Sequence, residues 1–380
     1  MNSEQLIKGN PEIFRLAPGD IDHLFRRSGV KGNILSPFHY NAEKAATSSP
    51  SALFKPLAES PRLKQIARGL LQPDLKIEYN RGGAGAADDQ YYVLLSNDDE
   101  AVLAQFVNSE EDLLLLLFND WESFLAWWTD VYAYTGSAEY QIIFPKTMEI
   151  EVLVCALHCV DIYRRSYMES MLDYSSSLSL ALTTQDFVQL LKRSLASKDK
   201  RWLVPTLFEI TPGLKNSNIA LKPEHLELAQ ELEFVTINDA TLTLSKKSRM
   251  MGTEFITSWM GSIGLQATAL INGEVRSLST AFMAPTAFAN HLISFSMGAG
   301  GNMRFRHQAS DREGLIKALS VWLQALHKAV GATGGSQDAA PGPAPAADPP
   351  IKTANPKFCG QCGAEIRAGK KFCTSCGTAV

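Results

Sequence analysis

Four cysteines near the end of the chain are spaced as ligands of one metal ion. They form two Cys-x-x-Cys pairs, which are made of Cys359, Cys362, Cys373 and Cys376. A glycine directly follows each pair, and glycine lets the backbone fold under a bound ion with positive φ. Two such turns supply four thiolates to a tetrahedral centre, the geometry of structural zinc. Two disulfides are the alternative, but a segment this short and this poor in apolar residues favours metal ligands.

The donor set also limits what the metal can do. Four thiolates complete the coordination of Zn²⁺ and leave no position for an activated water. Zinc binding therefore supplies folding free energy, about 10–16 kcal/mol in zinc-finger peptides. Residues 358–380 resemble the short zinc-ribbon modules found at the ends of many bacterial and archaeal proteins. The resemblance implies one structural Zn²⁺ without a catalytic role.

Two further cysteines, Cys155 and Cys159, lie one helical turn apart beside His158. A second metal site is one interpretation of this group. However, both cysteines share the i, i+3, i+4 spacing of Val152 and Ile162, which is typical of the apolar face of a helix. The spacing favours small buried side chains in a core helix over metal ligands.

Reaction motifs are missing from the sequence. It contains no Gly-x-Ser-x-Gly, no His-Glu-x-x-His and no Gly-x-x-x-x-Gly-Lys-Ser/Thr. Residues 81–89 and 297–302 are glycine-rich, but neither segment has dinucleotide spacing or a lysine for phosphates. Hairpin loops between strands explain both segments better than phosphate cradles do. We therefore expect a protein that is not an enzyme.

The overall composition is that of a soluble globular protein. The chain has 380 residues, of which 45% are hydrophobic and 20% charged, and its net charge is −4. This charge gives no general attraction to nucleic acid or to anionic membranes. No apolar run is long enough to span a bilayer, and the polar start lacks signal-peptide character. With reduced zinc thiolates, these features predict a cytoplasmic location.

Two parts of the body have similar sequence patterns, which indicates an internal duplication. Ser109–Asp112 and Ser310–Glu313 are both Ser-x-x-acid capping boxes, and a tryptophan follows each serine by twelve positions. Upstream, the segment 71–77 is similar to the segment 265–271. We interpret this similarity as two copies of one unit, each made of a helix, about three strands and a capped helix. Chance similarity is the alternative. The predicted fold class is α+β, with two similar helix/antiparallel-sheet/helix units around a helical middle.

The predicted domains follow from this pattern. The body covers residues 1–330, with copy one at about 60–134, a helical and wing-like middle at about 147–250, and copy two at about 250–330. Residues 331–357 are rich in Pro, Ala and Gly and are predicted to be a flexible linker. The zinc ribbon at 358–380 completes the chain.

The middle contains a helix, strand, turn, strand, helix order at 221–255 that is typical of a winged-helix unit. Lys246, Lys247 and Arg249 follow the expected wing. A DNA-reading helix needs side chains that contact bases, whereas the helix before this wing carries four glutamates, which phosphates repel. A scaffold role is therefore favoured, and DNA binding stays the alternative.

Residues 109–134 are predicted to form one tryptophan-rich helix that is apolar on nearly all sides. Such a helix is buried between layers or offers part of its surface to a partner. Because tryptophan is overrepresented at interface hot spots, Trp121, Trp127 and Trp128 are candidate protein-binding residues. For most of this helix, burial in the core is favoured over binding of a partner.

Three stretches of the body resemble a known family. They are RLAPGDIDHLFRRSGV at 15–30, GLLQPDLKIEY at 69–79 and SEEDLLLLL at 109–117. Their order is similar to that in the EspG-like cytosolic chaperones of type VII secretion. The resemblance covers about 14–330 and implies two quasi-symmetric α+β halves that shield the hydrophobic tip of a helical secretion substrate.

The sequence thus favours a non-enzymatic, cytoplasmic adaptor or chaperone-like protein with a tethered structural zinc ribbon. Its partner is expected to be a helical protein. A winged-helix-type DNA-binding regulator with an accessory ribbon is the alternative. A third hypothesis is an enzyme without a recognisable motif.

Overall fold

The computed structural model describes residues 11–40, 46–82, 91–95, 101–105, 113–138, 144–215, 217–256, 261–298 and 301–331, with the short pieces 357–358 and 365–366. The chain divides into two compact units, Met1–Pro343 and Ala344–Val380. We refer to the described part of the first unit as the body. The predicted linker lies outside the described residues, apart from Gly331 and Lys357 at its two ends.

The first half of the body runs from a strand through three helices to four strands and a helix. Its elements are β1 (Glu12–Leu16), α1 (Asp20–Ser28), α3 (Phe54–Glu59), α4 (Leu63–Leu71), β2 (Leu75–Arg81), β3 (Tyr91–Leu95), β4 (Ala101–Gln105), β5 (Leu113–Phe118) and α5 (Trp121–Tyr132).

The second half repeats this order with a larger helical part. Its elements are β6 (Met148–Glu149), α6 (Ile150–Leu172), β7 (Ala181–Thr183), α7 (Thr184–Ala196), α8 (Leu203–Ile210), the 3₁₀ helix η1 (Pro212–Leu214), α9 (Pro223–Glu231), β8 (Val235–Asn238), β9 (Thr241–Leu244), α10 (Lys246–Glu254), β10 (Ile263–Ile271), β11 (Glu274–Pro285), β12 (Asn290–Met297), β13 (Met303–Ser310) and α11 (Arg312–Gly331).

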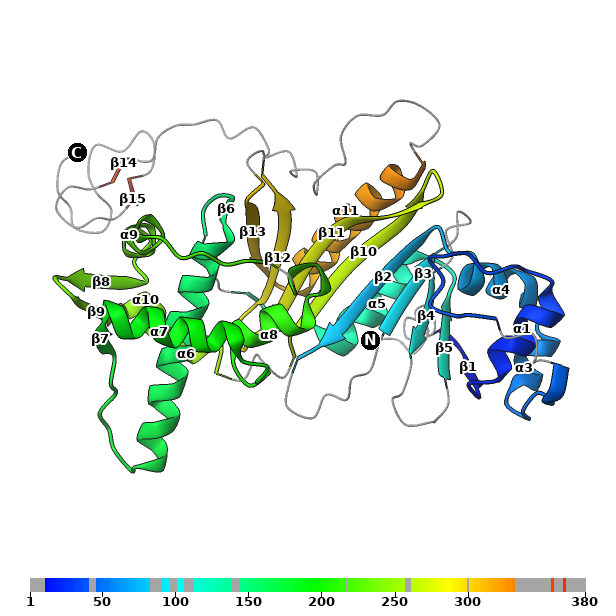
Figure 1. Ribbon diagram of the computed structural model, residues 1–380, viewed down its shortest axis with the longest axis horizontal. Coiled ribbons are helices and arrows are strands. Elements are labelled where there is room, and N and C mark those ends of the chain that lie inside the picture. Colours follow the sequence, from blue (N-terminus) through cyan, green and yellow to red (C-terminus); the bar gives the residue numbers. More distant parts are fainter. Residues whose placement is uncertain are drawn as a thin grey trace. The chain divides into compact units, whose positions relative to one another are not determined.

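The described strands of both halves join in one ten-stranded sheet, in the order β1-β5-β4-β3-β2-β10-β11-β12-β13-β6. The order is the same when read outward from the β2–β10 pair at the centre (Figure 1). β2 and β10 are antiparallel, and Glu78 faces Gln266 at the middle of their register. The two halves are therefore related by an approximate twofold axis at this pair. The predicted α+β fold with two similar units is confirmed.

One face of the sheet is covered by α5 and α11, which pack together. Their buried contact with β2, β3, β10 and β11 forms one core cluster that includes Tyr79, Trp128 and Trp322. On the other face, α1, α3 and α4 cover the first half, and they form the blue end of the molecule in Figure 1. The helical middle covers the second half through Phe282, Phe295 and their neighbours. Each half of the sheet is thus packed between two helical layers.

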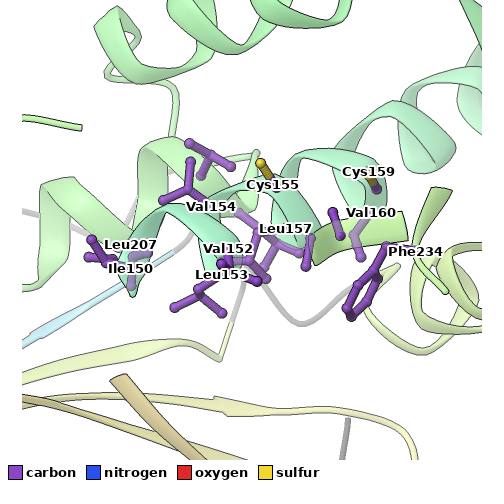
Figure 2. Close-up of a cluster of buried hydrophobic side chains, with 14 of the residues drawn as sticks. Ile150, Val152, Leu153, Val154, Cys155, Leu157, Cys159, Val160, Leu207 and Phe234 are labelled. Carbon is purple, nitrogen blue, oxygen red and sulfur yellow. The ribbon is translucent and has the colours of Figure 1, made fainter. Parts of the chain in front are cut away.

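Helix α6 is the central element of the middle, and its first part is apolar on all sides. Figure 2 shows this part surrounded by side chains that include Leu207 of α8 and Phe234, which precedes β8. Cys155 and Cys159 are both 0% exposed within this cluster, as the helical spacing predicts. Burial raises the pKa of the Cys159 thiol to about 12, so the thiol stays protonated and is a poor metal ligand.

The wing-like segment forms a separate three-stranded sheet in the order β7-β9-β8. β8 and β9 form a hairpin whose turn holds Asp239 at a φ of 53°, and α9 and α10 flank the hairpin. The predicted order of helix, strand, turn, strand and helix is confirmed. Thr183 caps α7, because its side chain accepts a hydrogen bond of 3.0 Å from the backbone N–H of Asp186.

Three details of the predicted duplication are wrong. Residues 109–134 do not form one helix: Leu113–Phe118 is strand β5, and Asp120 caps the shorter helix α5 by accepting from Ser123 N. The second helix is capped by Asp311, which accepts from Gly314 N, and not by Ser310. Leu71 ends helix α4 whereas Leu265 lies in strand β10, so the aligned segments do not correspond.

Both glycine-rich segments join antiparallel strands, as predicted. The first connects β2 to β3 and the second connects β12 to β13. Residues 83–90 and 299–300 lie outside the described residues. Among the helices that the structure describes, none combines the length and apolar character needed to cross a membrane.

Candidate functional site

The C-terminal segment begins with a small hairpin. Strands β14 (Lys357–Phe358) and β15 (Glu365–Ile366) are antiparallel, and Phe358 pairs with Glu365. Cys359 and Cys362 belong to the connection between these strands, so the hairpin brackets the first Cys-x-x-Cys pair. The four predicted zinc ligands themselves lie outside the described residues. A donor set of four thiolates fits Zn²⁺, which prefers sulfur and nitrogen ligands in a tetrahedron.

The tryptophan-rich helix lies mainly inside the body. Trp128 is 3% exposed and packs its ring against Tyr79 and Tyr132, so it belongs to the core. Trp121 is half-buried, and its indole N–H donates a 2.7 Å hydrogen bond to His327 Nε2 of α11. Trp127 is also half-buried, with ring contacts to Phe118 and Tyr132. These contacts join α5 to α11 and to the sheet, and they leave only parts of Trp121 and Trp127 at the surface.

Four exposed large apolar side chains lie at the C-terminal end of α6 or directly after it. Tyr167 is 39% exposed, Met171 60%, Leu172 78% and Tyr174 98%. We call these four residues the apolar end of α6. In Figure 1 this part of the green helix extends beyond the sheet of β7, β8 and β9. Large apolar side chains that lie close together at the surface mark contact sites for other molecules.

The sequence signal for this surface was present but weak. In the stretch YRRSYMESMLDY, Tyr163, Tyr167, Met171 and Tyr174 recur at helical spacing, but this spacing is the same for a buried face and for an exposed one. Only the structure shows that no other described element covers Leu172 and Tyr174. By contrast, the earlier turns of the same helix are buried on all sides.

Two of the three basic residues after the wing make hydrogen bonds within the body. The Lys247 ammonium donates a 2.7 Å hydrogen bond to the carbonyl of Leu232, at the end of α9, and lies 4.9 Å from the Phe234 ring centre. Burial lowers the pKa of Lys247 against a smaller opposite effect of Glu233. The Arg249 guanidinium donates to the carbonyl of Ser245. Lys247 therefore caps a helix and is not a free cation for a phosphate.

Glu149, Glu151 and His225 bring their ligand atoms within 4.8 Å of one another. The hydrogen bonds at the imidazole decide whether this group can hold a metal. The backbone N–H of Lys222 donates to His225 Nδ1, so the neutral ring carries its proton on Nε2 and donates to Glu149 Oε2 at 3.1 Å. Nε2 then has no lone pair for a metal. The group is a hydrogen-bonded link between the start of α9 and the start of α6.

This link lowers the pKa of the Glu149 carboxyl. The hydrogen bond from His225 is the main cause, and Asn302 donates a second hydrogen bond to the same carboxylate. Both bonds favour the charged form of the acid. The cluster is therefore satisfied without any added ion.

His158 is a buried histidine of α6 in the middle of the body. It is 4% exposed, and neither ring nitrogen has a hydrogen-bond partner among the described residues. The ring packs edge-on against Phe187 at 4.8 Å. Burial lowers the pKa of His158 to about 4, against a smaller opposite effect from the Phe187 backbone, which lies outside hydrogen-bonding geometry. The imidazole is therefore neutral at pH 7.

This pKa predicts an acid-sensitive stability. In the unfolded chain His158 takes up its proton near pH 6.5, whereas the folded protein takes it up only near pH 4. Stability is therefore complete above pH 6.5 and falls as the pH drops through this window, by about 3 kcal/mol for this one group. Urea unfolding at a series of pH values should show that His158→Gln reduces this slope. His39→Gln, which changes an exposed histidine, should leave the slope as it is.

Comparison with known proteins identifies the end of the chain. Residues 358–380 match the family model of a zinc-ribbon domain. This segment is therefore a zinc-ribbon domain, as its cysteine spacing predicts, and it belongs to a class of modules that bind zinc. No curated protein matches the chain.

Proposed function

We propose that the protein is a non-enzymatic, cytoplasmic adaptor or chaperone-like protein whose body binds a helical protein partner. The observation that carries the proposal is the apolar end of α6. Its four large side chains lie within eight residues at and just after the end of a long helix, and Leu172 is 78% and Tyr174 98% exposed. Aromatic and Met side chains are enriched in the cores of protein interfaces. Burial of such side chains under a partner removes apolar surface from water and so stabilises the complex.

The chemistry around this surface suits a polypeptide partner. Arg165 and Glu169 form an exposed ion pair of 2.7 Å on the same helix. Together with the apolar end of α6 they give an apolar centre with a polar edge, the usual anatomy of an interface. The resemblance to EspG-like chaperones supports an association with secretion.

The zinc ribbon is proposed as a second, tethered module of this adaptor. We infer that it holds one Zn²⁺ through Cys359, Cys362, Cys373 and Cys376, and that the ion is structural. The bound metal supplies tetrahedral cross-linking of the two Cys-x-x-Cys pairs. The proline- and alanine-rich linker that precedes it gives the ribbon reach toward a partner.

The first test changes the surface without changing the core. The double substitution Met171→Glu and Leu172→Glu should reduce co-purification of the partner from the native host at least about tenfold, because two desolvated apolar contacts are lost. The melting temperature should not change, since both side chains are exposed. Met297→Glu is the matched control, because Met297 is 64% exposed on β12.

Parallel purification of the chain without residues 331–380 separates the two modules. A partner that binds without these residues and is lost with Met171→Glu and Leu172→Glu belongs to the body. Equal recovery of the partner with both α6 variants would contradict the proposed surface. A partner that is lost only when residues 331–380 are removed would show that the zinc ribbon, and not the body, binds it.

A DNA-binding regulator is the second candidate, favoured by the strand order β7-β9-β8 and the helix before the wing. Against it, α9 has Glu224, Glu227 and Glu231 and the Lys247 ammonium is bound to the fold. Duplex DNA affinity that falls steeply with salt, and that is lost in Lys246→Glu with Arg249→Glu, would establish the regulator instead.

A further inference from the structure

A cavity of about 290 Å³ opens between helices α6, α7 and α8. Its volume is several times the roughly 30 Å³ that one water occupies in the liquid. Residues from all three helices and from the loop before α8 line it, among them His158, Ile162, Arg193, Ser194, Trp202 and Pro205. It is close to the lower end of the size range of small-molecule sites. The four residues of the apolar end of α6 do not belong to the lining.

His158 gives this cavity an unused hydrogen-bonding group. Its ring is more than nine-tenths buried, and both nitrogens lack partners among the described residues. A neutral imidazole has one N–H donor and one acceptor lone pair. Leaving such groups buried and unsatisfied costs about 1–3 kcal/mol each, which an occupant of the cavity would recover.

The charges at the cavity favour an anion. Arg165 and Arg193 both line it and both are exposed side chains. Arg165 binds Glu169 through Nε, which leaves the other N–H groups of the guanidinium available. No ion-pair partner of Arg193 exists within the described part of the chain. Two guanidinium groups at one opening provide fork-shaped donors that match a carboxylate.

Asp161 is the acidic residue of the lining, and its charge is already compensated. Its carboxylate accepts from the backbone N–H groups of Leu203 and Val204 at 2.9 and 3.0 Å. It also binds the Arg164 guanidinium at 2.8 Å. With these donors in place, Asp161 fixes the start of α8 and leaves Arg193 as the uncompensated charge of the cavity, beside Arg165, which is paired with Glu169.

We propose that this cavity binds a small organic acid, with its carboxylate at Arg165 and Arg193 and its apolar body against Ile162, Trp202 and Pro205. His158 donates to or accepts from a polar atom on the inner end of the ligand. None of the four apolar side chains of the proposed protein-binding surface lines this cavity, and the two sites share only Arg165. Occupancy ties α6, α7 and α8 together, so the ligand stabilises the middle of the body.

Benzoate is the probe, because it combines one carboxylate with an apolar ring. Titration of the full-length protein with benzoate at constant ionic strength should raise the melting temperature and change the tryptophan fluorescence in a saturable way. Arg193→Gln should raise the Kd about tenfold, as expected for the loss of a charge-assisted hydrogen bond. Lys192→Gln is the matched control, because Lys192 is the neighbouring exposed cation and does not line the cavity.

Trp202→Phe locates the binding event. This variant should keep the benzoate-dependent rise in melting temperature and lose the fluorescence change, since Trp202 lines the cavity. A fluorescence change that persists in Trp202→Phe would place the ligand elsewhere and overturn the proposal.

Two further ligands test the proposed chemistry. Benzamide, the neutral isostere of benzoate, should bind at least about tenfold more weakly if the arginines recognise charge. Equal affinity for benzamide would exclude an anion site, and equal affinity for inorganic phosphate would exclude an organic acid as the ligand class. The absence of any saturable response to millimolar benzoate would also overturn the proposal.

Discussion

Replacing Cys373 and Cys376 together with serine should abolish zinc binding by residues 358–380 and unfold that segment. The ribbon has few apolar residues, so metal coordination supplies most of its folding free energy, about 10–16 kcal/mol in comparable peptides. Serine oxygens are far poorer zinc ligands than thiolates. Native mass spectrometry should detect one Zn²⁺ on the parent chain and none on the variant.

The control for this experiment lies between the two ligands. Thr374→Ala with Ser375→Ala changes the same turn and should keep the bound zinc. The melting temperature of the body should be the same in all three proteins, because residues 1–343 form a compact unit of their own. Full zinc retention in the cysteine variant would refute the four-cysteine site, and a lower melting temperature of the body would show that the ribbon docks on it.

The zinc ribbon was predictable because its chemistry is local in sequence. Four ligands within 18 positions determine the metal, the geometry and the need for a turn after each pair. The helices and wing of the middle were predictable for a related reason. Periodic apolar residues and the strand, turn, strand pattern of the wing are signals carried by neighbouring residues.

Strand β5 was not predictable in this way, because it is buried on both faces. Leu113, Leu115 and Leu117 pack against the α1–α4 layer, while Leu116 and Phe118 pack toward α5. Burial on both sides removes the alternation that identifies a strand, and an uninterrupted leucine run is equally compatible with a helix. In β2, by contrast, buried and half-buried residues alternate, which is the pattern that identifies a strand.

The candidate sites depend on contacts between distant segments, which a single sequence does not show. Trp121 and His327 are 206 positions apart, and their hydrogen bond joins α5 to α11, a pairing that the sequence does not show. The cavity beside His158 exists only because α7 and α8 pack against α6. The similarity of the two halves was detectable in the sequence, but matching the residues of one half to those of the other required the register of the central β2–β10 pair.

The buried pair of Asp161 and Arg164 holds the middle of the body together. Arg164 is 0% exposed, and its guanidinium binds Asp161 through Nη1 and the carbonyl of Arg201 through Nη2 at 3.0 Å. Its charged plane also lies 5.5 Å from the ring centre of Trp202. One acid thus compensates a fully buried cation and, through its bonds to Leu203 and Val204, caps helix α8.

Asp161→Asn should therefore destabilise the body by about 3–5 kcal/mol, because it leaves the Arg164 charge buried without a counter-ion. Urea unfolding at pH 7 measures the loss. Glu169→Gln breaks the exposed pair with Arg165 on the same helix and should cost no more than about 1 kcal/mol. Adding Arg164→Met to Asp161→Asn should recover part of the loss, since the orphaned charge is then removed. Equal costs for Asp161→Asn and Glu169→Gln would mean that the pair contributes nothing beyond a surface contact.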